Sequence, residues 1–387
     1  MTSANGGLAW RISLQYAALF VVPGIYLPFF SVWLRSRGLT PTEISIMLSV
    51  GILVRLIAGP LAAHAVDRSG RRKAAIVTLA WASAATLTLF GWVEGFAAML
   101  IVWVLHTITW APITPFTDNI ALLATARHQL NYGRMRLWGS LSFLAAAYLA
   151  GLWLEGRPES WIYILLVGGI LLLAACSHLL PDIRLPLDKP RAGLPLLRLL
   201  RRPAFLLFML TTACLQASHA AFYTFGTLHW RSLGHSDAAI GWLWAEGVIA
   251  EVVLFAFAQR IPVRFGGAGL LVIAALGGLV RWSTTVFAED YLLLTLLQLL
   301  HAATFGAAHL GAMRLLSEGC APNESATAQT LYVAGNSAML ALATLAVGPL
   351  FAAHGGGMYW LMSLLSCCGG GLAMLLWRRR ALLNFSA

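Results

Sequence analysis

Long apolar runs alternate with short polar segments along the whole of this 387-residue chain. A membrane-spanning helix needs about 20 consecutive apolar residues, and twelve stretches of the sequence meet that requirement. They are residues 10–33, 43–66, 74–93, 96–125, 134–154, 159–180, 204–229, 238–259, 267–287, 291–315, 326–352 and 358–377. The pattern predicts an all-α integral membrane protein with twelve transmembrane helices.

Composition supports the same class and excludes others. Hydrophobic residues make up 59% of the chain and charged residues 11%, whereas soluble domains carry about 25% charged residues. So few charges cannot cover a water-exposed surface, which argues against a soluble enzyme, a disordered chain or a nucleic-acid binder. The five cysteines lack the spacing of metal ligands, so we expect no metal site.

The distribution of Lys and Arg predicts the orientation, because these residues are enriched in cytoplasmic loops. With the N-terminus inside, twenty of them fall in cytoplasmic segments and four in external ones. We therefore expect both termini in the cytoplasm. The net charge of +11 then reflects basic loops rather than a polyanionic partner.

The longest non-apolar stretch divides the chain into two halves with six predicted helices each. We expect an N-terminal bundle over residues 1–180, a cytoplasmic linker over 181–203 and a C-terminal bundle over 204–387. A basic loop follows the second helix, and a weaker copy, Arg264-Phe265-Gly266-Gly267, follows the eighth. Two halves with equivalent loops are typical of secondary transporters built from internal repeats.

The loop after the second helix resembles the signature of the major facilitator superfamily, G-x-x-x-D-R-x-G-R-R-K. Ala63 stands where the leading glycine is expected, and the matching positions include Asp67, Arg68, Gly70, Arg71 and Arg72. The resemblance implies a major facilitator fold in which this loop takes part in conformational change. A patch that only directs membrane insertion is the alternative, and both roles are compatible.

A small set of ionisable residues falls inside the predicted spans. A charge near the centre of a membrane helix costs roughly 2.5–3.5 kcal/mol, so each is a candidate for function. The alternative for each is a structural ion pair or a polar contact between helices. The set comprises Arg55, Asp118, Glu246, Glu251, Arg281, His106, His219, His301 and His309.

Asp118 and Arg136 form the first candidate pair. Two prolines, Pro112 and Pro115, precede Asp118, and Arg136 follows it after eighteen residues. Antiparallel helices joined by a short loop would bring the two side chains to similar depth. The segment resembles lactose permease and its relatives, and this resemblance assigns Asp118 and Arg136 to the substrate site.

Arg281 and His301, separated by twenty residues, resemble the Arg and His of the same permease's proton-coupling and substrate network. That family has a carboxylate three residues after the His, where this chain has Thr304. Proton coupling therefore requires another acid, for which Glu246 and Glu251 are the candidates. Burial and a nearby Arg shift a carboxyl group's pKa in opposite directions, so either residue could switch. We expect Glu246 to pair with Arg281, because the two lie at a similar depth from the outside face, and Glu251, closer to mid-membrane, to carry the proton.

A closer resemblance extends over nearly the whole chain, to the 3-phenylpropionic-acid transporters within the same superfamily. The segments that carry it are Leu27–Leu34, Tyr132–Ser140, Ser218–Tyr223 and Leu300–Phe305 with His309-Leu310. It implies a small aromatic carboxylate as substrate. Fold and lineage do not fix a ligand, so the inference also needs a suitable site.

The residues available suit a substrate with one carboxylate and one ring. Arg136 or Arg55 would hold the anion by a bidentate contact. Trp110, Trp138 and Tyr223 would flank the ring, and His219 shares a helical stripe with Tyr223. For the aromatic residues, contact with lipid or with neighbouring helices is the commoner role.

We therefore expect a proton-coupled symporter that imports a small aromatic carboxylate such as 3-phenylpropionate by alternating access. A sugar or nucleoside symporter is the alternative, since Asp118 and Arg136 equally suit hydroxyl groups. The sequence contains no enzyme signature, and a membrane enzyme or a solute sensor is a further alternative. We expect no cofactor beyond the proton gradient, no nucleic-acid partner, a monomer, and a location in the bacterial inner membrane.

Overall fold

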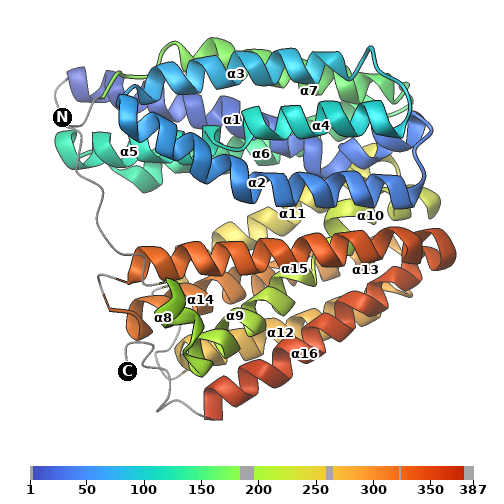
Figure 1. The fold of residues 1–387 in the computed structure, drawn as a ribbon. Coiled ribbons are helices and arrows are strands. Elements are labelled where there is room, and N and C mark those ends of the chain that lie inside the picture. Colours follow the sequence, from blue (N-terminus) through green and yellow to red (C-terminus); the bar gives the residue numbers. More distant parts are fainter. Residues whose placement is uncertain (1–2, 184–195, 259–264, 322–323, 379–387) are drawn as a thin grey trace. The chain divides into compact units, whose positions relative to one another are not determined.

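The computed structural model describes residues 3–183, 196–258, 265–321 and 324–378, and every regular element within these ranges is a helix. The long helices of each half lie side by side (Figure 1). In the first half they are α1 (Ser3–Ser36), α2 (Pro41–Ser69), α3 (Arg72–Leu89), α4 (Phe96–Trp110), α5 (Ile113–His128), α6 (Tyr132–Leu154) and α7 (Ser160–Ser177). The second half contains α8 (Leu196–Leu200), α9 (Pro203–Ala217), α10 (Ala220–Ser232), α11 (Asp237–Ala256), α12 (Gly266–Thr285), α13 (Tyr291–Leu299), η3 (Ala302–Ala307), α14 (Ala308–Gly319), α15 (Ser325–His354), η4 (Gly355–Met358) and α16 (Tyr359–Arg378).

Each of the twelve predicted spans contains a helix among its described residues, which confirms the fold class. Ten helical segments among the described residues have the length and composition to cross a membrane, and one of them, Ser325–Arg378, contains both α15 and α16. The remaining span is α3, whose mean hydropathy is lowered by Arg72 and Lys73 at its start. The pairs α4–α5, α9–α10 and α13–α14 each make up one span.

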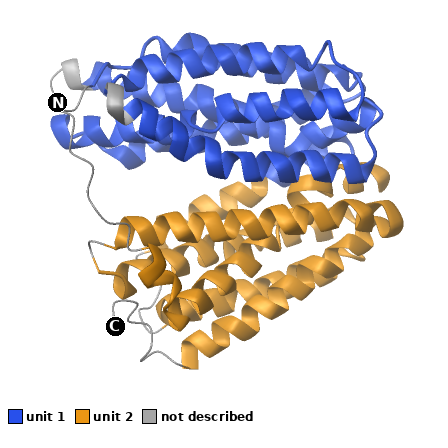
Figure 2. Ribbon diagram, in the orientation of Figure 1, with its two compact units in different colours: residues 1–190, 236–245 blue, residues 191–235, 246–387 orange. Residues whose placement is uncertain are grey.

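The chain forms two compact units, one of residues 1–190 and 236–245 and one of residues 191–235 and 246–387 (Figure 2). The expected linker, 181–203, lies largely outside the described residues, which resume at α8. Residues 236–245 were expected in the C-terminal half but group with the first unit. The backbones of α6 and α11 approach closely at Gly151 and Gly241, and the Ala238 N–H donates to the Glu155 carboxylate (3.1 Å).

Small residues permit the close packing of α1 in the first unit. This helix contacts both α6 and α7. A Cβ on Gly24 would lie 2.7 Å from the carbonyl oxygen of Phe143, so α1 and α6 meet there backbone to backbone. In the second unit, α12 and α14 meet in the same way at Gly267 and Gly311. Such close approach through small residues is typical of membrane helix packing.

Three of the spans depart from regular α-helix, and each departure lies next to a candidate residue. The span with Asp118 is interrupted at Ala111 and Pro112, and the span with His219 at Ser218 and His219 itself. The segment η3 is a π-helix that begins directly after His301. Irregular backbone within a membrane helix is tolerated where neighbouring groups satisfy it, and π segments are frequent at functional sites.

Candidate functional site

Asp118 is held by two tyrosine hydroxyls in the first unit. Its Oδ1 atom accepts a hydrogen bond from Tyr16 on α1 (2.5 Å) and one from Tyr132 on α6 (3.1 Å). Tyr16 is completely buried. Both donors act on one carboxylate oxygen, so they fix the orientation of the group. Oδ2 has no hydrogen-bond partner among the described residues.

Arg136 lies beside this carboxylate and on two aromatic rings. Its Nε atom is 3.8 Å from Asp118 Oδ1, and a third of its side chain is exposed (33%). The guanidinium carbon lies 4.2 Å from the centre of the Phe20 ring and 5.2 Å from that of Tyr16. These rings stabilise the cation and orient its plane. Within the described part of the chain, the two terminal nitrogens have no hydrogen-bond partner, so their fork is available to a ligand.

Gly139 makes room for this arrangement one turn further along α6. A Cβ at this position would lie 2.9 Å from Cδ2 of Phe20 and 3.3 Å from a terminal nitrogen of Arg136. Any larger residue would therefore displace the ring or the guanidinium. Gly139 thus has a steric role.

Arg281 is at the centre of a second polar cluster, in the second unit. It is fully buried and donates to Gln298 Oε1 (2.6 Å) and Thr304 Oγ1 (3.0 Å). A third contact joins its terminal nitrogen to Nδ1 of His301 (3.1 Å). Its guanidinium also lies over the Trp282 ring (4.4 Å). With its fork occupied and no exposed surface, Arg281 organises neighbouring side chains rather than binding a ligand itself.

Thr304 connects this arginine to His219. Its hydroxyl lies 3.1 Å from Nε2 of His219 and accepts from Arg281. His219 is fully buried at the break between α9 and α10, and its ring stacks on that of Tyr223. The position where a carboxylate was expected by resemblance thus carries a neutral hydroxyl with two partners.

Glu251 reaches His301 from α11, with 3.5 Å between Oε2 and Nε2. Because arginine has only donors, Nδ1 of His301 accepts from Arg281, and a neutral His301 then carries its proton on Nε2, which faces Glu251. Gly306, within the π-helix, leaves space for the side chains of Glu251 and Leu254. Arg281, His301 and Glu251 are therefore contiguous.

Glu246 does not pair with Arg281, in contrast to our expectation. Its side chain is buried (8% exposed), and its Oε2 has no hydrogen-bond partner among the described residues. The donors of Arg281 are directed instead at Gln298, His301 and Thr304. Glu246 and Glu251 therefore occupy different environments.

The other candidates lie apart from these two clusters. Arg55 is exposed on α2. Trp110 stacks on His106, with ring centres 6.2 Å apart. Trp138 is half exposed (49%) and makes no ring contact within the described part of the chain. Among the described residues, neither Trp110 nor Trp138 makes a ring contact with Phe20 or Tyr16, although Trp110 and Phe20 pack against the same core cluster.

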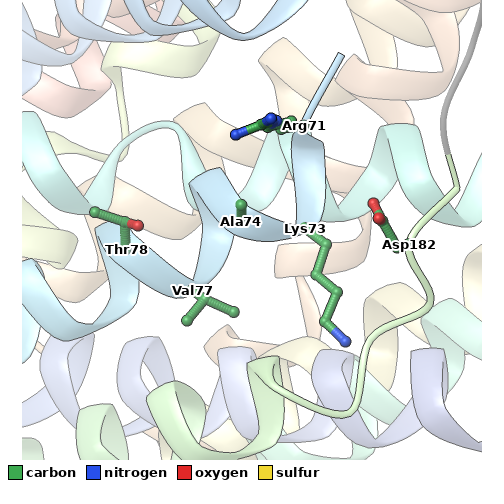
Figure 3. Close-up of a pocket in the computed structure, with 6 residues that line it drawn as sticks. All are labelled: Arg71, Lys73, Ala74, Val77, Thr78 and Asp182. Carbon is green, nitrogen blue, oxygen red and sulfur yellow. The ribbon is translucent and has the colours of Figure 1, made fainter. Parts of the chain in front are cut away.

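The basic loop after α2 turns at Gly70, whose φ of 67° is left-handed and caps the helix. The side chains of Asp67 and Arg68 lie outside the described residues. Arg71 and Lys73 line a surface pocket of about 360 Å³ together with Asp182 (Figure 3). Arg72 begins α3. Charges of both signs meet in this pocket, so it is not a simple anion site.

The sequence did not identify the residues that orient Asp118, Arg136 and Arg281. These are Tyr16, Phe20 and Gln298, and also Thr304 in its role as hydrogen-bond partner of Arg281. Tyr132 and Gly139 belong to a segment that the sequence singled out, and Thr304 was noted as a departure from a pattern. Tyr16 and Phe20 lie on a separate apolar helix and carry no local motif. Their contribution depends on how α1 packs against α5 and α6.

Comparisons with known proteins also indicate a transporter. The model of the MFS_1 like family matches residues 9–364. A probable 3-phenylpropionic acid transporter of Escherichia coli (strain K12) is 31% identical over 373 residues, covering 92% of this chain and 94% of that protein. The maltose permease of Geobacillus stearothermophilus is 28% identical, covering 70% and 68%. A crystal structure of the nucleoside transporter NupG superposes with a TM-score of 0.82 at 15% identity, covering 98% and 99%.

Proposed function

The chain belongs to the MFS_1 like family of major facilitator transporters, and on this basis we propose that it imports a small aromatic carboxylate together with protons. It is a multi-pass membrane protein and a transporter rather than an enzyme. The proposed substrate class is that of 3-phenylpropionate, one carboxylate joined to one ring. The named E. coli relative favours this class.

The proposal depends mainly on the surroundings of the Arg136 guanidinium. Its plane rests on Phe20 and Tyr16, and its terminal nitrogens have no hydrogen-bond partner among the described residues. A planar fork with two free donors matches the geometry of a carboxylate. The Phe20 ring beside it is partly exposed and is suited to contact an aryl group. Arg281 is fully buried and both of its terminal nitrogens have protein partners, so it does not compete for this role.

Asp118 limits which anions the site accepts. Its negative charge next to Arg136 opposes a second carboxylate. The two tyrosine hydroxyls donate to Oδ1, which reduces that repulsion without removing the charge. A substrate with a single carboxylate meets less opposition than one with two, so we propose a monocarboxylate.

Proton coupling is assigned to Glu251, His301 and Arg281. Within the described residues, Glu251 is the one acid whose carboxylate approaches His301. The proton affinity of a partly buried carboxylate depends on both its burial and the charges next to it. In one conformation it takes a proton, and in the other it releases it. The two units alternate access to the substrate as the bundles move relative to one another.

The cellular setting completes the proposal. The protein works as a monomer in the bacterial inner membrane with both termini in the cytoplasm, as the Lys/Arg distribution favours. It needs no cofactor beyond the proton gradient and no nucleic-acid partner.

Symport of a sugar or nucleoside is the second candidate. Asp118 Oδ2 has no partner among the described residues and is an open acceptor for a substrate hydroxyl. The similarity to a maltose permease and the fold of NupG fit this alternative.

Competition for uptake separates the two. Cells expressing the protein take up labelled 3-phenylpropionate, and unlabelled arylalkanoates, maltose or uridine are added in excess. Our proposal requires inhibition by arylalkanoates alone. Inhibition by maltose or uridine, or no uptake above that of cells lacking the protein, contradicts it.

A further inference from the structure

His309 continues a column of rings that begins at His301, within the membrane span Tyr291–Gly319. The two histidines are eight residues apart, about 12 Å along a helix. The ring of Phe305 stands between them and is nearly parallel to both, with ring centres 5.3 Å from His301 and 6.4 Å from His309. A phenyl ring has no group that transfers a proton, so the two imidazoles do not exchange protons directly.

Glu251 reaches this column from α11 at a level between the two histidines. Its Oε2 lies 3.5 Å from Nε2 of His301, and its Cγ would lie 3.7 Å from a Cβ on Gly306, three residues before His309. One turn further along α11, Phe255 packs edge-on against the His309 ring (6.2 Å). The charges of Glu251 and His309 are therefore close enough to act on each other.

His301 is not able to accept the proton of Glu251 in this arrangement. Its Nδ1 accepts from the Arg281 guanidinium (3.1 Å), so a second proton on the ring would have to occupy that nitrogen against a positive charge. Its Nε2 already carries the proton that faces Glu251. A proton held by Glu251 therefore needs another acceptor.

His309 has the properties of such an acceptor. It is partly buried, and within the described part of the chain it makes ring contacts but no hydrogen bond, so both of its nitrogens are available. An imidazole can accept a proton on one nitrogen and release one from the other. With the N-terminus in the cytoplasm, as proposed above, the tenth span runs inward, and His309 lies on the cytoplasmic side of Glu251.

The helices that pack against α14 offer no alternative acceptor among the described residues. These helices are α9, α12 and α15, and their titratable side chains are Cys214, Arg281, Tyr332 and His354. Of these, His354 alone titrates near neutral pH, and it lies at the external end of α15. On α14 itself, Arg314 and Glu318 are turned about 140° and 180° away from His309 around the helix. On α11, Glu246 is turned about 140° away from Glu251.

We propose that His309 is the proton-release residue of the transport cycle, which accepts the proton of Glu251 and passes it to water on the cytoplasmic side. The O–H bond of Glu251 breaks as an N–H bond forms on His309, and the proton on the opposite ring nitrogen leaves to water. Glu251 is then a carboxylate again and His309 a neutral imidazole, so no other reactant is consumed. The inference rests on the proposed proton-coupled uptake.

Net uptake and exchange of labelled 3-phenylpropionate in proteoliposomes, with the outside acidic, test this role. His309→Gln is polar but cannot carry a proton. Net uptake requires proton release inside, so it is expected to fall about 100-fold, the low end of what one positioned proton-transfer group contributes. Exchange of internal for external substrate requires no release and should keep the wild-type rate.

Rescue by a soluble base separates proton transfer from a structural role. Imidazole enclosed in the vesicles should restore part of the net uptake of His309→Gln, because it supplies the missing base. A side chain that only packs against its neighbours would not respond. His354→Gln, which removes an exposed histidine at the other end of the span α15, is the matched control and should keep both wild-type rates.

The failure of this role and the failure of the proposed function give different results. If the wild type accumulates 3-phenylpropionate and His309→Gln does so at the same rate, His309 does not release the proton while the proposed function stands. Equal losses of net uptake and exchange, with no effect of imidazole, lead to the same conclusion. If the wild type neither accumulates nor exchanges 3-phenylpropionate, the proposed function is wrong and the role of His309 falls with it. Size-exclusion profiles and melting temperatures exclude misfolding, and His309→Asn provides the answer if His309→Gln does not fold.

Discussion

Oε2 of Glu251 lies 3.5 Å from Nε2 of His301, although the two residues are on different helices. The resemblance to lactose permease places the coupling acid three residues after the histidine, where this chain has Thr304. The structure brings a carboxylate to the same histidine from α11 instead. A carboxylate therefore does contact this histidine, but it comes from a different part of the sequence.

Replacement of Glu251 tests whether this carboxylate carries the proton. Glu251→Gln keeps the size of the side chain but cannot ionise, so we expect loss of accumulation against a gradient while exchange of labelled for unlabelled substrate continues. The measurement is uptake and counterflow in the same proteoliposome preparation. Glu246→Gln is the comparison and should retain accumulation, since Glu246 does not contact the network. Full accumulation by Glu251→Gln would show that another group is the carrier.

A lysine at position 136 tests the bidentate contact. Arg136→Lys keeps the charge but replaces the planar fork with a point charge. We expect the apparent affinity for 3-phenylpropionate to fall about tenfold, as one charge-assisted hydrogen bond is lost. Initial uptake rates over a range of substrate concentrations measure this. Unchanged kinetics would exclude recognition of the carboxylate by the guanidinium fork.

Gly139 is expected to matter through the position of Arg136. In Gly139→Ala, the new Cβ would displace Phe20 or the guanidinium, and a shift of about 1 Å in a binding group can lower activity by up to about 100-fold. Uptake should therefore drop well below that of Gly168→Ala. Gly168 lies in α7, where an added Cβ would meet no other atom within 4 Å, so its substitution should be neutral. Equal uptake by the two variants would contradict the steric role.

Thr304 is expected to stabilise the buried cluster. Thr304→Val removes the acceptor of Arg281 and the partner of His219, and leaving buried polar groups unsatisfied costs about 1–3 kcal/mol. The melting temperature in detergent should fall. Thr295→Val is the control, because the buried Thr295 hydroxyl has no hydrogen-bond partner within the described residues. Equal melting temperatures would show that the Thr304 contacts contribute little.

Glu324 provides a stability test remote from both clusters. It is nearly fully buried and lies 2.6 Å from Arg202. Breaking a buried pair by removing one partner costs about 3–5 kcal/mol, so Arg202→Gln should unfold at a clearly lower temperature than the wild type. Arg201→Gln, which changes an exposed neighbour, should not. A difference too small to measure would mean that solvent or Arg198, whose terminal nitrogen lies 3.7 Å from Glu324 Oε1, compensates the carboxylate left by the substitution.

The sequence was sufficient to predict the elements and one charged pair. Apolar run length determines membrane spans, so the twelve helices followed from the pattern alone. The eighteen-residue spacing of Asp118 and Arg136 across a short loop predicted their proximity, and the structure places them 3.8 Å apart. Run length and the spacing of neighbouring residues are local properties, and both can be read directly from the sequence.

Contacts between distant helices were not predictable in the same way. Tyr16 is 102 residues from Asp118, and no motif marks it. The expected Glu246–Arg281 pair rested on estimated depth, whereas the orientation of each side chain around its helix determined the actual partners. The grouping of residues 236–245 with the first unit likewise depends on glycine contacts between α6 and α11.

Uptake of labelled 3-phenylpropionate into proteoliposomes, with and without an imposed pH difference that is acidic outside, tests the central claim most directly. Our account predicts accumulation above the external concentration only when the gradient is present, and its collapse when a protonophore is added. Uptake that ignores the gradient would contradict proton coupling. An absence of uptake alongside transport of a sugar or nucleoside would contradict the assignment of an aromatic carboxylate.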